Sequence, residues 1–316
     1  LNNLSHIGGS LRLWECVDMT STNGLDNLLY IGNKVDLFEN RQLVEIVGFE
    51  NISTLPGGLV VEENEALPNL TGFESLTHVG GDVQIIDNIS LTSIQGLDNL
   101  ETIGETIDID GNPVLTNLDD LSNLNSVGEN IYVTDNEGLV NITGLSSIVN
   151  FNGYILINDN PILMSLEGLE NISANDITNL VISNCDSLSF CSLENICQYL
   201  NEDIGPAHIV SNNSGCNSEP QITATCAVAG IHEVLAENLF SVYPNPFLQE
   251  ATLESKILQS GTEVHFYNYL GNRVKSIYGF YGTQIRIDRT GLPEGLYLLK
   301  IVQGNEVIGL KKIVVK

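Results

Sequence analysis

A phrase of 24 residues decides the fold, and residues 96–119 give it in full as GLDNLETIGETIDIDGNPVLTNLD. Glycine recurs at multiples of 24 on both sides of this phrase, and Asp120 stands where one member is missing. The positions are Gly24, Gly48, Gly72, Gly96, Gly144 and Gly168. A fixed period of this length is typical of a solenoid, in which each repeat forms one turn and stacks on its neighbours.

Each repeat also predicts a short strand followed by a bend. Two apolar residues alternate, as Ile107 and Ile109 do, and an Asn follows three positions later. Alternation with period two is expected of a strand with one buried face. We predict that the Asn is buried at the bend and satisfies backbone groups that would otherwise cost about 1–3 kcal/mol each. The ladder positions are Cys16, Asn40, Asn64, Asn88, Asn112, Asn136, Asn160 and Cys185, which predicts eight rungs with Cys at both ends.

The repeat phrase resembles a known family. Gly-Leu-Glu/Asp-Asn-Leu, then Ile-Gly, then a strand ending in Asn is similar to the L-domain-like repeats of receptor ectodomains and bacterial surface proteins, relatives of leucine-rich repeats. The resemblance covers roughly residues 1–190. It departs from true leucine-rich repeats because the next apolar residue comes three positions after the Asn, as from Asn160 to Leu163. We therefore expect an all-β fold, with a right-handed β-solenoid of about eight 24-residue rungs in place of a helix-backed horseshoe.

Four cysteines follow the repeats, in a region (191–226) that looks like the C-terminal cap of the bacterial L-domain-like proteins. The stretch 192–201 is amphipathic and predicts one short helix. No Cys-x-x-Cys pair occurs, so disulfides are favoured over zinc. Three pairings exist, and alternation along the chain favours Cys191 with Cys216 and Cys197 with Cys226. Disulfides would place the protein outside a reducing cytosol.

Charge divides the chain into two parts. Residues 1–226 hold 32 acidic and three basic residues, whereas residues 238–316 hold six acidic and nine basic residues. This change predicts two domains joined by a linker at 227–237. So acidic a first part would repel nucleic acid, and no apolar run approaches the ~20 residues of a membrane-spanning helix. The chain opens in mid-repeat, so we expect any secretory signal and N-terminal cap to lie outside this sequence.

Residues 238–316 lose the period and predict about seven short alternating strands. Gly, Pro and Asn separate these strands, which is typical of a small immunoglobulin-like β-sandwich. The expected strands span 240–243, 251–253, 263–268, 273–277, 284–288, 296–302 and 307–315.

Short blocks in this region resemble, in order, those of the type A sorting domain of the type IX secretion system of Bacteroidetes. The blocks are YPNPF (243–247), LGNRV (270–274), GLPEGLY (291–297) and KKIVVK (311–316). The resemblance implies export of a folded cargo through the periplasm and outer membrane to the cell surface or the extracellular space. It implies as partners an outer-membrane β-barrel shuttle and a sortase that cuts within 227–237. The expected sorting-signal residues are Tyr243, Pro244, Asn245, Pro246, Gly271, Gly295, Tyr297, Lys311, Lys312 and Lys316.

No catalytic motif is present, and we predict a protein that is not an enzyme and needs no cofactor. The pair His232-Glu233 supplies only half of a zinc-protease motif. An acidic residue precedes most ladder positions, and this row could draw in Ca²⁺ or form a solvated line of turns. The row is Glu15, Glu39, Glu63, Asp87, Asp135 and Asp159, with Gly111 interrupting it.

Strand residues between the buried ones should point outward and form one ribbon of surface. They are Arg12, Trp14, Asp36, Phe38, Gln84, Asp108, Tyr132 and Thr134. Aromatic rings beside polar groups suit contacts with a protein or a glycan. Two functions stay open for the solenoid: a binding or adhesion module for an unidentified ligand, and a structural spacer or surface-coat element.

Overall fold

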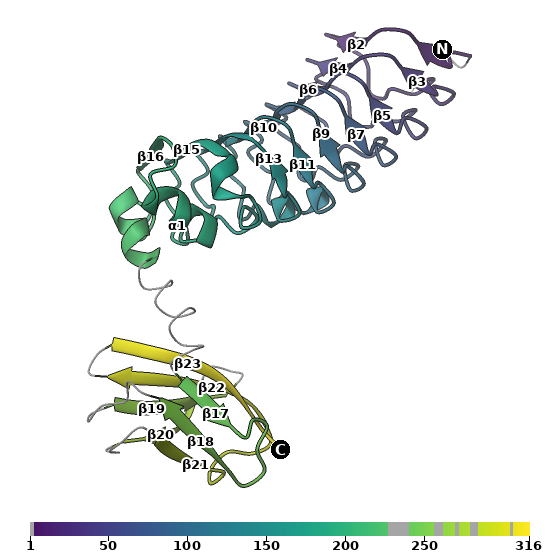
Figure 1. Cartoon of the computed structure of the whole chain (residues 1–316). Helices are drawn as coiled ribbons and strands as arrows, with labels where there is room; N and C mark the ends of the chain where they lie inside the picture. Colours follow the sequence, from purple (N-terminus) through teal and green to yellow (C-terminus); the bar gives the residue numbers. More distant parts are fainter. Residues whose placement is uncertain (1–2, 227–239, 256–261, 269–271, 279–283, 304–305) are drawn as a thin grey trace. The chain divides into compact units, whose positions relative to one another are not determined.

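The computed structural model describes residues 3–226, 240–255, 262–268, 272–278, 284–303 and 306–316. The chain divides into two compact units, Leu1–Cys226 and Ala227–Lys316. The first unit is a β-solenoid and the second is built of antiparallel sheets (Figure 1). The mostly-β prediction is confirmed.

One side of the solenoid is a parallel sheet of nine strands, in the order β16-β15-β14-β12-β10-β8-β6-β4-β2. Ile107 pairs with Val83 on one side and with Ile131 on the other, so the register advances by one repeat per strand. The strands are β2 (Leu11–Trp14), β4 (Val35–Phe38), β6 (Leu59–Glu62), β8 (Val83–Ile86), β10 (Ile107–Asp110), β12 (Ile131–Thr134), β14 (Gly153–Asn158), β15 (Ile177–Ser183) and β16 (Ala207–Val210). The ninth strand, β16, lies in the region that the sequence assigns to the cap.

Shorter strands line another side of the coil. Five of them form a second sheet in the order β13-β11-β9-β7-β5, and β1 pairs with β3. They are β1 (His6–Ile7), β3 (Tyr30–Ile31), β5 (Thr54–Leu55), β7 (His78–Val79), β9 (Thr102–Ile103), β11 (Ser126–Val127) and β13 (Asn150–Phe151). Three short 3₁₀ turns, η1 (Asp119–Leu121), η2 (Thr143–Leu145) and η3 (Ala174–Asp176), fit the three-residue apolar period better than an α-helix would. The apolar residues of every rung meet in one continuous core.

The Asn ladder holds the rungs together. Asn112 is fully buried, and its side-chain amide donates to the carbonyl of Asp110 in its own rung (2.9 Å) and of Ile85 in the rung before (2.8 Å). Its Oδ1 accepts the backbone N–H of Asn88 at 3.1 Å. From Asn64 to Asn160 each Asn thus satisfies backbone groups of its own rung and of the rung before, and Asn40 those of the rung before, which is the role predicted from the sequence.

The repeated phrase Gly-Leu-Glu/Asp-Asn-Leu also has a structural role. The carboxylate of Asp98 accepts the backbone N–H of Gly96 at 2.9 Å, and the amide of Asn99 donates to the carbonyl of Glu74 in the rung before at 2.7 Å. The acid therefore closes the local turn, and the Asn joins that turn to its neighbour.

Cys185 is not the last ladder position, and the prediction that Cys marks both ends is wrong. Its backbone N–H donates to Oδ1 of Asn212 at 3.0 Å, and the amide of Asn212 donates to the carbonyl of Ile182 at 2.9 Å. Asn212 follows β16 and extends the ladder into the ninth rung.

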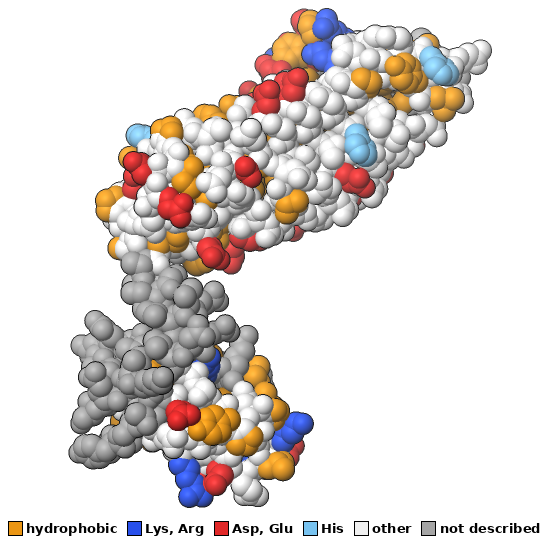
Figure 2. Space-filling model, viewed as in Figure 1, with side chains coloured by type: hydrophobic (Ala, Val, Ile, Leu, Met, Phe, Trp, Pro, Cys, Tyr) orange, Lys and Arg blue, Asp and Glu red, His pale blue; other side chains and the backbone are white. Residues whose placement is uncertain are grey.

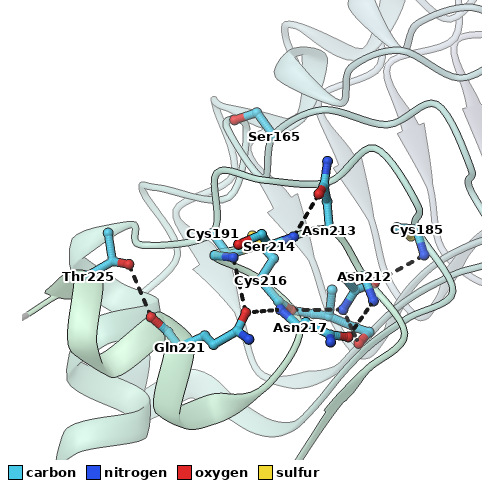
Figure 3. Close-up of a disulfide and its surroundings, with 12 residues drawn as sticks. Ser165, Cys185, Cys191, Asn212, Asn213, Ser214, Cys216, Asn217, Gln221 and Thr225 are labelled. Carbon is cyan, nitrogen blue, oxygen red and sulfur yellow. Dashed lines mark hydrogen bonds between the residues drawn. A yellow bond between two sulfur atoms is a disulfide. The ribbon is translucent and has the colours of Figure 1, made fainter.

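A disulfide-linked cap covers this end of the solenoid. It contains α1 (Glu194–Asn201) and a helical segment over 219–226. Disulfides join Cys191 to Cys216 and Cys197 to Cys226, which is the alternating pairing. In Figure 3 the Cys191–Cys216 bridge lies beside Gln221, whose side-chain oxygen accepts the backbone N–H of Gly215.

These contacts predict the thiol chemistry of the whole chain. Mass spectrometry of the unreduced protein should show two disulfides and two free thiols, Cys16 and Cys185. Iodoacetamide should modify half-exposed Cys16 in the native protein but Cys185 only after unfolding, because burial raises the pKa of the Cys185 thiol to about 11. Four further free thiols, or a bound zinc ion, would contradict the cap.

The second unit has a three-stranded antiparallel sheet, β17-β18-β21, and a four-stranded one, β20-β19-β22-β23. Residues of both sheets share one core, which includes Phe240, Leu253, Phe266 and Ile313. The strands are β17 (Phe240–Tyr243), β18 (Glu250–Ser255), β19 (Thr262–Tyr267), β20 (Arg273–Ile277), β21 (Gln284–Asp288), β22 (Gly295–Gln303) and β23 (Glu306–Val315). All seven expected strands are present, with ends that differ from the prediction by at most one residue except at β18, which is longer.

Candidate functional site

The side of the nine-stranded sheet that faces away from the core carries two columns of side chains, which we call the outer face. Cross-strand pairing places each member directly beside the next. The first column is Arg12, Asp36, Val60, Gln84, Asp108, Tyr132 and Leu156, and the second is Trp14, Phe38, Glu62, Ile86, Asp110, Thr134 and Asn158. The predicted ribbon residues therefore do lie on one surface.

The first two rungs of the outer face hold a patch of aromatic and basic side chains. The Trp14 ring is 50% exposed and meets Phe38 edge-on, with ring centroids 5.9 Å apart. The guanidinium carbon of Arg12 lies 5.2 Å from the Trp14 ring centroid, within the range of a cation–π contact. The solenoid unit has only three basic residues, and two of them, Arg12 and Lys34, lie here. Figure 2 shows Lys and Arg side chains gathered at the N-terminal end of the solenoid, next to hydrophobic and acidic ones.

Asp36 was predicted to lie exposed on the ribbon. Its side chain does belong to the first column of the outer face, but it is buried. It is 2% exposed, and its Oδ2 lies 2.7 Å from Nζ of Lys34 and 3.7 Å from Nε of Arg12. The two cations and the neighbouring Val60 cover the carboxylate. Asp36 therefore orients the basic groups of the patch and presents little surface of its own.

A second aromatic pair lies further along the outer face. Tyr132 and Tyr154 meet edge-on, with ring centroids 5.5 Å apart. Thr134 donates to Asp110 at 2.6 Å beside them. Tyr154 was not among the predicted ribbon residues, because it lies just before the alternating residues Ile155 and Ile157 of its repeat. The early start of β14 at Gly153 brings Tyr154 into the sheet.

Between the two aromatic pairs the outer face is acidic and hollowed. A shallow pocket of about 350 Å³ is lined by Lys34, Val60, Asp82, Gln84 and Glu105 together with the glycines of two turns. Half-buried Asp108 lies next to Gln84 in the first column. Burial, and then the charges of Asp110, Asp82 and Glu62, raise the pKa of Asp108 to about 6.

This pKa shift predicts a pH-dependent stability. Because the carboxyl of Asp108 is harder to ionise in the folded state, the free energy of unfolding should fall as the pH rises from about 4 to about 6. Asp108→Asn removes that penalty and should raise the unfolding free energy above pH 6 by about 1 kcal/mol, a value discounted for partial solvent exposure. Below about pH 4 the variant and the native protein should be equally stable, because both side chains are neutral there. Urea denaturation across pH measures this, with exposed Asp18→Asn as control; equal shifts in both variants would contradict the assignment.

The acidic row before the ladder gains no support as a calcium site. Glu39, Asp87 and Asp159 have φ of 54°, 53° and 52°, and Gly111 takes the same left-handed conformation at 65°. The row thus occupies the turn that leads into each bend. Asp and Gly adopt the left-handed conformation of this turn more readily than most residues do. Among the described residues no three His, Cys, Asp or Glu side chains come together as metal ligands do.

The first and last blocks of the second unit, YPNPF and KKIVVK, meet at the end of the terminal strand. Oδ1 of Asn245 accepts the backbone N–H of Val314 at 2.8 Å, and Phe247 pairs with Val315. Arg289 donates to the carbonyl of Lys316 at 2.6 Å. The loop 244–247 therefore covers the end of β23, which is an edge strand of its sheet.

The remaining predicted signal residues occupy separate places. The hydroxyl of Tyr243 donates to Glu254, and that of Tyr297 to the carbonyl of Pro293. Pro244 and Pro246 each follow a cis peptide bond in the loop that contains Asn245. Gly295 begins β22, Lys311 and Lys312 lie within β23, and Gly271 lies outside the described residues.

The part of the chain that contains the four blocks matches one known family. Residues 241–316 match the secretion system C-terminal sorting domain. The chain thus carries a sorting domain of the type IX secretion system, which implies interaction with that machinery and export to the cell surface or extracellular space. No curated protein and no solved structure matches the chain in the corresponding comparisons. Within the part of the chain that the structure describes, no helix is long and apolar enough to cross a membrane.

Proposed function

We propose that this chain is a non-enzymatic surface or secreted protein of the Bacteroidetes whose L-domain-like solenoid binds an external ligand through its outer face. The sorting domain is handed to an outer-membrane β-barrel shuttle and cut by a surface sortase within 227–237, which releases or attaches the cargo. The sorting-domain match supports the export half of this proposal.

The patch of Arg12, Trp14 and Phe38 carries the binding half. A half-exposed Trp held between an arginine and a second ring is a typical anchor of binding surfaces, where aromatic and Arg side chains are enriched. Two of the three basic residues of an otherwise acidic unit gather at the same place. A spacer or surface-coat element, the alternative function, requires no such patch.

Retention of the labelled full chain on intact bacterial cells and on extracted surface material tests this proposal. The double substitution Trp14→Ala with Phe38→Ala should lower retention at least about tenfold, because a central aromatic anchor contributes about 1.4 kcal/mol or more. Tyr30→Ala is the matched control, since Tyr30 is a 47%-exposed aromatic residue on β3, away from the outer face. Equal retention of all three proteins, with unchanged melting curves, would favour the spacer.

A further inference from the structure

The spacing of the two aromatic pairs points to an extended ligand. Phe38 lies on β4 and Tyr132 on β12, with β6, β8 and β10 between them in the sheet. Four steps at the usual strand separation place the pairs about 19 Å apart along the solenoid axis. A ligand that contacts both pairs must therefore be a chain that crosses the strands, and small molecules are too short.

The part of the outer face between the two aromatic pairs, which we call the floor, determines which kind of chain can bind. The side chains of Glu62, Gln84, Asp108 and Asp110 present carboxylate and amide oxygens there, and Asp82 lines the hollow beside them. Lys34, the cation at this hollow, is already paired with Asp36 at 2.7 Å. The floor thus offers hydrogen-bond acceptors, and a matching ligand must supply donors.

The charge of the solenoid and the spacing of its strands further limit the chemical class of the ligand. Residues 1–226 carry 32 acidic and three basic residues, so an anionic polymer would be repelled. Sugar hydroxyls are neutral donors that bond well to carboxylates, and the C–H face of a pyranose ring stacks on an aromatic ring. One sugar unit advances an extended glycan by about 5 Å, which is close to one rung of the sheet at ~4.8 Å.

We propose that the outer face binds a neutral glycan chain that runs along the solenoid axis, stacked on Trp14 and Phe38 at one end and on Tyr132 and Tyr154 at the other. About four or five sugar units bridge Phe38 and Tyr132, and about seven reach from Trp14 on β2 to Tyr154 on β14, one for each strand crossed. The carboxylates of Glu62, Asp108 and Asp110 accept hydroxyl donors from the units between. This inference rests on the proposed binding function and names its ligand class.

Binding of neutral oligosaccharides of graded length tests the inference. Calorimetry on the full chain would use α- and β-linked glucan, mannan and xylan oligomers of two to eight units. At least one series should show affinity that rises with length, gains at least about tenfold up to about seven units and then levels off, because longer chains find no further ring of the outer face to stack on. Affinity that is independent of length, or no binding in any series at millimolar concentration, would overturn it.

Matched variants locate the ligand. Tyr132→Ala and Trp14→Ala should each weaken binding of the seven-unit oligomer at least about tenfold, yet leave a two-unit oligomer less affected because it touches one pair only. Tyr132→Phe should retain most of the affinity, since it keeps the ring. Phe190→Ala, which removes a 45%-exposed ring outside the outer face, should change nothing.

Two outcomes separate this inference from the proposed function. If no glycan binds while Trp14→Ala with Phe38→Ala still abolishes retention on cells, the outer face binds a ligand of another class and only the glycan inference is wrong. If binding of a basic polypeptide, lost at high salt, replaces glycan binding, the acidic floor acts by charge and the inference is again wrong. If retention on cells does not depend on the outer face, the proposed function fails as well.

Discussion

Deleting residues 307–316 should abolish export of the protein and leave the solenoid folded. The deletion removes almost all of β23, which pairs with β22 along its length and buries Ile313 and Val315 in the core of the second unit. It also removes the backbone groups that bind Phe247 and Arg289. The second unit should therefore lose its fold, because a four-stranded sheet loses an edge strand and part of the shared core.

Cell fractionation with an antibody against the solenoid measures this. Full-length protein should reach the surface or the medium, and the truncated form should stay in the periplasm with an unchanged melting temperature of the solenoid, whose core is its own. Ser241→Ala, a substitution at an exposed position of β17 outside the four blocks, is the control that should be exported normally. Truncated protein in the medium would show that the sorting domain has another role.

The converse experiment adds the signal to a foreign cargo. Ala227–Lys316 forms a compact unit with its own core, so it can be fused to a fluorescent protein. The fusion should reach the surface of a host that has the type IX system and should be cut within or close to 227–237. A fusion that is never exported would contradict the proposed role of this segment.

The sequence predicts the register of the solenoid well for a physical reason. The side chain of a ladder Asn bonds backbone groups of the rung before it, which is possible only when the two rungs stack in register. A period of 24 in the ladder positions therefore also predicts which strands pair. The ninth strand was not predicted in this way, because the cap helix interrupts the 24-residue spacing. Asn212 follows Cys185 by 27 positions, yet Ala207, Ile209 and Asn212 keep the spacing of Ile107, Ile109 and Asn112.

Burial on the outer face could not be predicted in the same way. Alternation tells which side of a sheet Asp36 occupies, but its exposure depends on the lengths and charges of side chains in the neighbouring rungs. Arg12 and Lys34 cover it, whereas Trp14 on the edge strand β2 is 50% exposed. The pocket beside Gln84 likewise arises from glycine turns of two rungs, which only stacking brings together.

Replacing Asn112 with Ala, in the middle of the ladder, should strongly destabilise the solenoid. The side chain bonds the backbone of three other residues: the N–H of Asn88 and the carbonyls of Ile85 and Asp110. The bonds to Asn88 and Ile85 are buried and the bond to Asp110 is part-buried, and a buried polar group left unpaired costs about 1–3 kcal/mol. Some of the freed backbone groups can bond to water or move to a new partner, which lowers the total cost. We therefore expect the free energy of unfolding to fall by about 2–4 kcal/mol.

Urea denaturation followed by the emission of Trp14 measures this loss, since the single Trp of the chain lies in the solenoid and reports on that unit alone. The control has to be an Asn of the same unit whose side chain the fold does not use. Asn158 is unsuitable, because its Oδ1 accepts the hydroxyl of Ser183 at 2.6 Å. Asn152 is exposed and makes no side-chain hydrogen bond with any residue that the structure describes, so Asn152→Ala should change the unfolding free energy by less than about 0.5 kcal/mol. If Asn112→Ala and Asn152→Ala unfold at the same urea concentration, the ladder does not hold the rungs together, and the stacking of the apolar core alone must fix the register.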